Sequence, residues 1–248
     1  MSFQLILPLL SSAVMILFTA SVLQRYVVRR KAHFLFWGIG LGMFAIGSLS
    51  EAYFAVVGWS AAVFFAWYLF GAALNAAWIG HGTLHLLVRR RWAHVVTVVL
   101  VVASIVAGVM MLSIVPRLEA SAFERALPIS EQYREIMPAI RDGATVRLTT
   151  PFFNIYGLLT LVGGALWSAW LFLRKQVLPN RVLGNALIAG GALSIGLAST
   201  ATRLGFGGYL YLGELVAAVL MYGGFQIASA PATESERAEA MQAATQAA

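Results

Sequence analysis

Seven long apolar stretches fill most of this chain, and they restrict its fold more than any other feature. Each stretch can cross a bilayer, because a transmembrane helix needs about 20 mainly apolar residues. Only 11% of the 248 residues are charged, against about 25% in soluble domains. The sequence therefore predicts an all-α, polytopic membrane bundle of seven transmembrane helices over residues 1–230, with a polar tail at 231–248. We place the spans at 3–24, 34–57, 61–88, 93–115, 151–173, 182–203 and 207–228.

The basic residues predict how the bundle is oriented. Cytoplasmic loops of membrane proteins carry an excess of lysine and arginine. We therefore expect the N-terminus outside, the C-terminus in the cytoplasm, and a multi-pass protein of the inner (cytoplasmic) membrane. This distribution also accounts for the net charge of +7, so the expected partner is the lipid bilayer and not nucleic acid. The three short loops that are basic and contain no acidic residue carry Arg25, Arg29, Arg30 and Lys31, then Arg89, Arg90 and Arg91, then Arg174, Lys175 and Arg181.

The residue types that are absent exclude several cofactors. The only lysines, Lys31 and Lys175, lie outside the spans, so no retinal Schiff base is expected. The chain has no cysteine, which excludes disulfides, thiolate-ligated zinc and iron–sulfur clusters. The sequence contains no Ser-His-Asp arrangement, phosphate-binding loop or kinase motif, and an enzyme is the less favoured interpretation.

The loop 116–150 is the longest, and we expect it outside the membrane between the fourth and fifth spans. Ser130 to Tyr133 has the pattern of a helix start, and Tyr133, Ile136, Met137 and Ile140 follow helical spacing. One interpretation is a short amphipathic helix over the outer mouth of the bundle, and the other is an ordinary interfacial loop.

A weak internal similarity predicts a parallel repeat. When the chain is shifted by 149 residues, Arg25 falls on Arg174 and the segment 45–58 falls on 194–207. The first three spans then match the last three, with the fourth as a connector. Some small transporters use such parallel repeats and bind their ligand at the interface between them.

Carboxylates inside the membrane are the strongest functional signal. A charged side chain at the bilayer centre costs about 2.5 kcal/mol or more, so it usually faces the bundle interior and has a partner. Glu51 and Glu214 lie at similar depths in the outer halves of the second and seventh spans. We interpret them as the centre of a ligand or ion site, and the competing interpretation is a structural network of hydrogen bonds and ion pairs. The predicted ligand-binding residues are Glu51, Glu214, Arg203, Asn154, Tyr156, Tyr53, Tyr209, Tyr211 and Asn75.

Two histidines indicate a second, alternative site. His81 and His85 are one turn apart on the third span, while His33 and His94 lie at the membrane boundary. An i, i+4 histidine pair can hold a metal, and a single histidine can ligate haem. The competing interpretation is that these side chains are interfacial or bonded to the backbone.

Several stretches resemble an uncharacterised family of bacterial seven-helix membrane proteins. They are SEAYFAVVGW, YLFGAALNAAWIGHGTL, PFFNIYGLLTLVGGALWSAW and YLGELVAAVL. The layout is also similar to the seven-helix input modules of some bacterial signalling enzymes, although this chain carries no fused output domain. The resemblance implies a fold and no activity.

Three functions remain open. The first is a receptor-like or accessory module that binds a small-molecule ligand in the outer-half polar pocket and acts through a membrane or cytoplasmic protein partner. The second is a small-solute or proton-coupled transporter. The third is a membrane subunit that binds haem, a quinone or a pigment.

Overall fold

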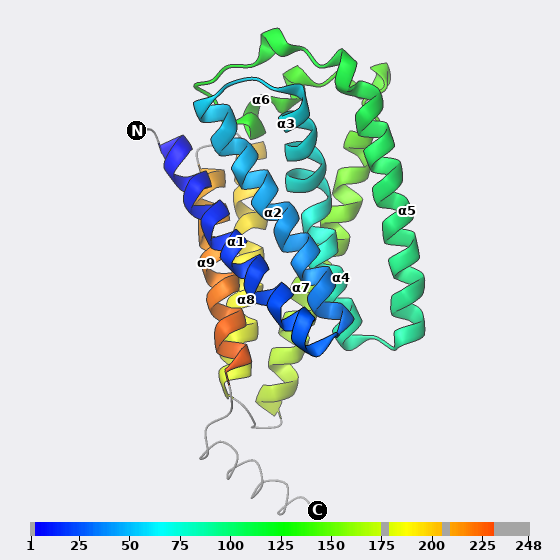
Figure 1. The fold of residues 1–248 in the computed structure, drawn as a ribbon, viewed down its shortest axis with the longest axis vertical. Helices are drawn as coiled ribbons and strands as arrows, with labels where there is room; N and C mark the ends of the chain where they lie inside the picture. The colour runs from blue at the N-terminus through cyan, green and yellow to red at the C-terminus, as the bar shows by residue number, and fades with distance from the viewer. Residues whose placement is uncertain (1–2, 175–178, 205–208, 231–248) are drawn as a thin grey trace, which may run out of the picture.

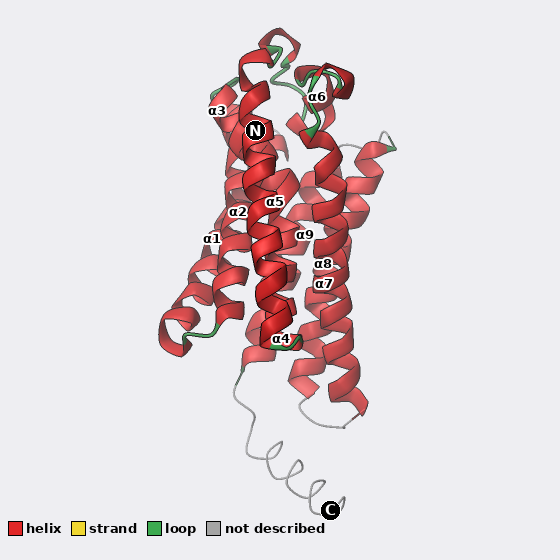
Figure 2. Ribbon diagram, turned by 90° about the vertical axis from the view of Figure 1, so that its right-hand side faces the viewer, coloured by secondary structure: helices red, strands yellow, loops and turns green. Residues whose placement is uncertain are grey.

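The computed structural model describes residues 3–174, 179–204 and 209–230, and this part of the chain is almost entirely helical (Figures 1 and 2). Seven of its helical spans are long and apolar enough to cross a membrane, which confirms the predicted number. The helices are α1 (Phe3–Arg29), α2 (Ala32–Val56), α3 (Ala61–Ala66), the π-helix η1 (Trp67–Leu74), α4 (Asn75–Leu87), α5 (Arg90–Ile114), η2 (Val115–Arg117), η3 (Ala120–Ala122), α6 (Ile129–Ile136), η4 (Ile140–Asp142), α7 (Val146–Arg174), α8 (Pro179–Arg203) and α9 (Leu210–Ser229).

The third and fifth spans differ in detail from the prediction. The third is not one uninterrupted α-helix, because η1 separates α3 from α4. The fifth begins at Val146 and not at residue 151, so Pro151 lies inside α7. A proline near the start of a helix removes only one backbone hydrogen bond, and the hydroxyl of Thr149 bonds the carbonyl of Val146 at 2.7 Å in the same turn. The tail 231–248 and the expected start of the seventh span at 207 lie outside the described residues.

The spans form a ring with one helix outside it. Contacts run from α1 to α2, from α2 to α4, then through α7, α8 and α9 and back to α1. Helix α5 touches this ring only sparsely and lies at its edge in Figure 1. This arrangement fits the expected connector role of the fourth span, while the repeat itself stays a prediction.

The two ends of the bundle differ. The loop end carries residues 118–145, and the basic end carries the connections at 30–31 and 88–89. The described chain starts toward the loop end and ends at the basic end (Figure 1). This agrees with termini on opposite sides, and the side that faces outward stays a prediction.

Glycines allow backbones to approach at the helix crossings. A Cβ on Gly47 would lie 2.6 Å from the Cα of Gly71, and a Cβ on Gly40 would lie 2.5 Å from the amide nitrogen of Ile79. Small residues at such crossings permit close packing in lipid, where association depends on contact and not on the hydrophobic effect. Gly163, by contrast, faces open space.

Of the two interpretations of the long loop, the structure shows the short helix, α6, which ends at Ile136, before Met137 and Ile140. Its inward face is buried at Ile129, Gln132 and Ile136. The side-chain amide of Gln132 donates to the carbonyls of Glu124 and Leu127, both at 2.8 Å. These bonds hold the loop in a fixed shape across the loop end.

Candidate functional site

Glu51 and Glu214 meet inside the bundle, close to the loop end. Glu51 projects from α2 and is 3% exposed, and Glu214 projects from α9 and is 9% exposed. The two side chains lie close enough to each other to interact directly. The indole Nε1 of Trp67 donates to Oε1 of Glu51 at 3.0 Å. The structure thus brings together the two carboxyl groups that the sequence placed at similar depths.

The burial of two adjacent carboxyl groups favours a bound proton. An ionised carboxylate only accepts hydrogen bonds, whereas a protonated one also donates. Apart from the contact between the two side chains, Oε2 of Glu51 and Oε2 of Glu214 are buried without a protein donor. A proton on either group provides the missing donor, while two adjacent buried negative charges would repel each other strongly. We call Glu51 and Glu214 the carboxyl pair.

The loop 118–145 closes over the carboxyl pair. Tyr211 is 6% exposed, lies near both carboxyl groups, and its hydroxyl oxygen accepts from the backbone N–H of Ile129 at the start of α6. The ring of Tyr133 packs 6.0 Å from that of Trp67 and 6.0 Å from that of Tyr68. Helix α6 therefore separates the carboxyl pair from the solvent at the loop end.

The π-helix η1 begins at the residue that contacts the pair. Trp67 is the first residue of η1, and π segments recur at functional sites because they change which side chains face inward. Asn75 donates to the carbonyl of Gly71 at 2.8 Å, and Asn154 from α7 donates to the carbonyl of Ala72 at 3.2 Å. Backbone groups inside a membrane must be satisfied by the protein, so these two amides stabilise η1 and do not contact the carboxyl pair.

The predicted histidine site is a separate hydrogen-bonded network in the half of the bundle toward the basic end. The Nδ1 atom of His81 lies 2.7 Å from the Tyr156 hydroxyl, and its Nε2 lies 2.8 Å from Oγ1 of Thr97. The Nε2 of His85 lies 2.9 Å from the same Oγ1. Thr97 donates its only hydroxyl hydrogen to the carbonyl of Ala93, so it accepts from both histidines. His81 must then accept from Tyr156 at Nδ1.

This network restricts the metal and haem alternatives. His81 is fully buried and uses both ring nitrogens in hydrogen bonds, so ligation would require one of those bonds to break. Among the described residues, no group of three histidine or acidic side chains is arranged to hold a metal ion. His81 and His85 are better explained as structural partners of Tyr156 and Thr97, with His85 at the rim of the network.

Other predicted residues lie apart from the carboxyl pair. Tyr53 packs beside Phe54, with the ring centroids 6.2 Å apart, and Tyr209 is 61% exposed. Arg203 ends α8, and its side chain lies outside the described residues. Of the nine predicted residues, Glu51, Glu214 and Tyr211 therefore converge.

Sequence reasoning missed three residues of these sites. Trp67 belonged to a run of aromatic residues that packing alone explains, Thr97 is a single hydroxyl in an apolar helix, and Gln132 lies in a loop. Trp67 and Thr97 could have been found because each carries a hydrogen-bonding group at the depth of a buried ionisable residue on another span. Only the fold shows which of these groups face each other.

Comparison of the chain with protein families, with curated protein sequences and with solved structures gave no match. The class therefore follows from the seven apolar helices alone, and the chain is a multi-pass integral membrane protein. It contains two buried polar sites, the carboxyl pair toward the loop end and the histidine network toward the basic end. The resemblance found in the sequence stays a prediction.

Thr97→Val is expected to destabilise the protein by about 1–3 kcal/mol, because two histidine donors would lose their acceptor inside the bundle. Thermal unfolding in detergent, followed by circular dichroism, measures the loss. Thr200→Val is a matched control, since Thr200 makes the same kind of bond to a carbonyl one turn earlier but is exposed. Equal effects of the two substitutions would contradict the network.

Proposed function

We propose that this chain is a proton-coupled membrane transporter for small cationic solutes, with the carboxyl pair as its proton site. The observation that supports this proposal is the burial of two adjacent carboxyl groups, Glu51 and Glu214, whose Oε2 atoms have no protein donor. Ionisable residues buried in membrane proteins commonly belong to proton and ion pathways. Of the functions that the sequence left open, a proton-coupled one uses this pair most directly.

The solute class follows from the surroundings of the pair. Once the proton leaves, the pair carries negative charge beside aromatic rings from Trp67, Tyr68 and Tyr133. Carboxylates and aromatic faces together attract ammonium groups, the rings through cation–π attraction. A proton and an organic cation therefore compete for one site. An exchanger needs such competition, because binding of one ion must release the other.

Tight helix packing separates the carboxyl pair from the histidine network. Such a barrier suits a carrier better than a channel. Gly47 of α2 contacts Gly71 of η1 backbone to backbone, between the level of Glu51 and that of Asn75. This crossing leaves no room for a side chain, so α2 and η1 leave no gap between them at this level. Helix α6 closes the other side, so the pair is occluded from both ends.

The proton itself is tested by infrared spectroscopy of the protein in lipid at neutral pH. We expect the C=O stretching band of a buried protonated carboxyl group in the wild type, and its loss in both Glu51→Gln and Glu214→Gln. A glutamine can donate to the remaining carboxylate, so the fold is retained without a proton. Glu135→Gln, on the exposed face of α6, is the control and should keep the band. A band that survives in either pair variant would contradict a shared proton.

Transport is tested in liposomes that contain a trapped pH dye. We expect external tetramethylammonium to raise the internal pH of vesicles that carry the wild type, because one proton leaves for each cation that enters. The Gln variants should give no response. Saturable binding of the cation without a pH change would instead favour the receptor-like module, and the absence of both binding and flux would overturn the cationic substrate class.

A further inference from the structure

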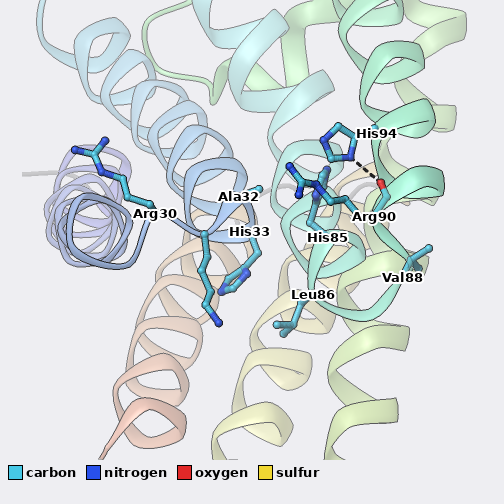
Figure 3. A pocket seen from close by; sticks show the side chains of 9 residues that line it. Arg30, Ala32, His33, His85, Leu86, Val88, Arg90 and His94 are labelled. Carbon is cyan, nitrogen blue, oxygen red and sulfur yellow. Dashed lines mark hydrogen bonds between the residues drawn. The ribbon is translucent and has the colours of Figure 1, made fainter.

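A second cavity lies at the basic end, far from the carboxyl pair. It has a volume of about 490 Å³ and lies between the start of α2, the end of α4 and the start of α5 (Figure 3). Its polar lining consists of three permanent cations and three histidines, and the described residues around it include no acidic side chain. They are Arg30, Lys31, Arg90, His33, His85 and His94. We call this cavity the basic pocket.

The charge of the basic pocket is unbalanced. The only ion pair among the described residues joins Arg141 and Asp142 in the loop 118–145, so within this part of the chain no carboxylate pairs with Arg30, Lys31 or Arg90. Figure 3 shows Arg90 and His94 on the α5 side and His33 on the α2 side, while the Arg30 guanidinium points away from the histidines. Arg90 is therefore a cation beside the histidines, whereas the Arg30 guanidinium lies at the rim. Lys31 also lines the basic pocket.

Two helix starts add to the positive field. The N-cap positions of α2 and α5, Lys31 and Arg89, make no side-chain capping bond. The first backbone N–H groups of both helices therefore remain open to an external acceptor, and helix N-termini favour anions. Together with the side chains, this arrangement suits a multiply charged anion such as a phosphate group.

The pocket also contacts lipid-facing surface. Leu86 and Val88 line it and are 50% and 39% exposed. Val88 lines in addition an apolar groove of about 280 Å³ between α4 and α7, beside Leu84, Gly163 and Trp167. A soluble anion would use only the basic pocket, whereas a lipid would fill both cavities.

We infer that the basic pocket binds the phosphate headgroup of an anionic phospholipid, with one acyl chain in the α4–α7 groove. Basic pockets between transmembrane helices are suited to anionic headgroups. Val88 lines both cavities, so the polar cavity and the apolar groove are neighbours. A phospholipid likewise has a polar headgroup next to its apolar chains. This site is independent of the proton chemistry of Glu51 and Glu214.

The test counts phosphatidylglycerol molecules bound to the full chain by native mass spectrometry, with phosphatidylcholine as the neutral competitor. The double variant Lys31→Gln/Arg90→Gln is expected to bind phosphatidylglycerol about 25-fold more weakly, at about fivefold for each cation. Arg29→Gln/Arg91→Gln is the matched control, because it removes the same charge at the same end from exposed side chains outside the pocket lining. Equal losses in the two double variants would overturn the site.

A second variant separates a lipid from a soluble anion. A Cβ on Gly163 meets nothing within 4 Å, so Gly163→Leu should fill the groove without disturbing the fold. We expect it to weaken phosphatidylglycerol binding and to leave binding of glycerol 3-phosphate unchanged. If Gly163→Leu has no effect on phosphatidylglycerol, or if glycerol 3-phosphate competes as well as the lipid does, the occupant is a soluble phosphate and the lipid assignment is wrong.

Discussion

Glu51→Leu is expected to destabilise the protein by about 3 kcal/mol, because it removes one partner of a buried polar pair. The carboxyl group of Glu214 would then be buried with no partner, and the indole N–H of Trp67 would lose its acceptor. Glu214→Leu should have a similar effect for the same reason. Equilibrium unfolding in mixed micelles measures each loss.

The double variant Glu51→Leu/Glu214→Leu distinguishes a coupled pair from two separate residues. Once one member is gone, removing the other also removes an unsatisfied group, so the two effects should fall short of additivity by about 1–3 kcal/mol. Glu124→Leu/Glu135→Leu in the loop 118–145 is the control cycle, since no hydrogen bond joins those two side chains, and its effects should add. Additive losses at Glu51 and Glu214 would show that the two carboxyl groups do not depend on each other.

Gly47→Ala is expected to cost about 1–3 kcal/mol or more, because overpacked sites must separate their neighbours. The new Cβ would meet the Cα of Gly71 at 2.6 Å, and a backbone atom cannot rotate away as the end of a side chain can. Separation of α2 from η1 also moves Trp67, so the near-ultraviolet circular dichroism should change together with the unfolding midpoint.

Gly163→Ala is the control for this prediction. Its Cβ faces open space, and alanine is favoured over glycine inside a helix by about 1 kcal/mol. We therefore expect Gly163→Ala to be neutral or stabilising. A Gly47→Ala protein as stable as Gly163→Ala would contradict the close crossing of α2 and η1.

The sequence predicted the spans well because their signal is local. Each span is a run of apolar residues, and lipid requires such a run to satisfy its backbone as a helix. The π segment Trp67–Leu74 could not be found in this way, since its residues are as apolar as those around it. One of its carbonyls, that of Ala72, accepts a hydrogen bond from Asn154, which is distant in the sequence.

The candidate site was predictable in part for a similar reason. Burying a carboxyl group in a membrane is costly, so Glu51 and Glu214 stood out and were expected to find partners. The identity of those partners depends on helix rotation, which apolar composition does not determine. Tyr156 shows this limit, because it lies on the expected helix but faces His81 at 2.7 Å and not the carboxyl pair.

The carboxyl pair lies between two groups of helices in the closed ring. Glu51 belongs to the three spans before α5, and Glu214 belongs to the last three spans, α7, α8 and α9. In the proposed function, the shared proton therefore joins two structural halves. When that proton is present, a hydrogen bond holds the halves together at the loop end. When it is lost, two negative charges face each other across the same seam and push it apart. In this proposal, a single proton thus determines whether the two halves attract or repel each other at the carboxyl pair.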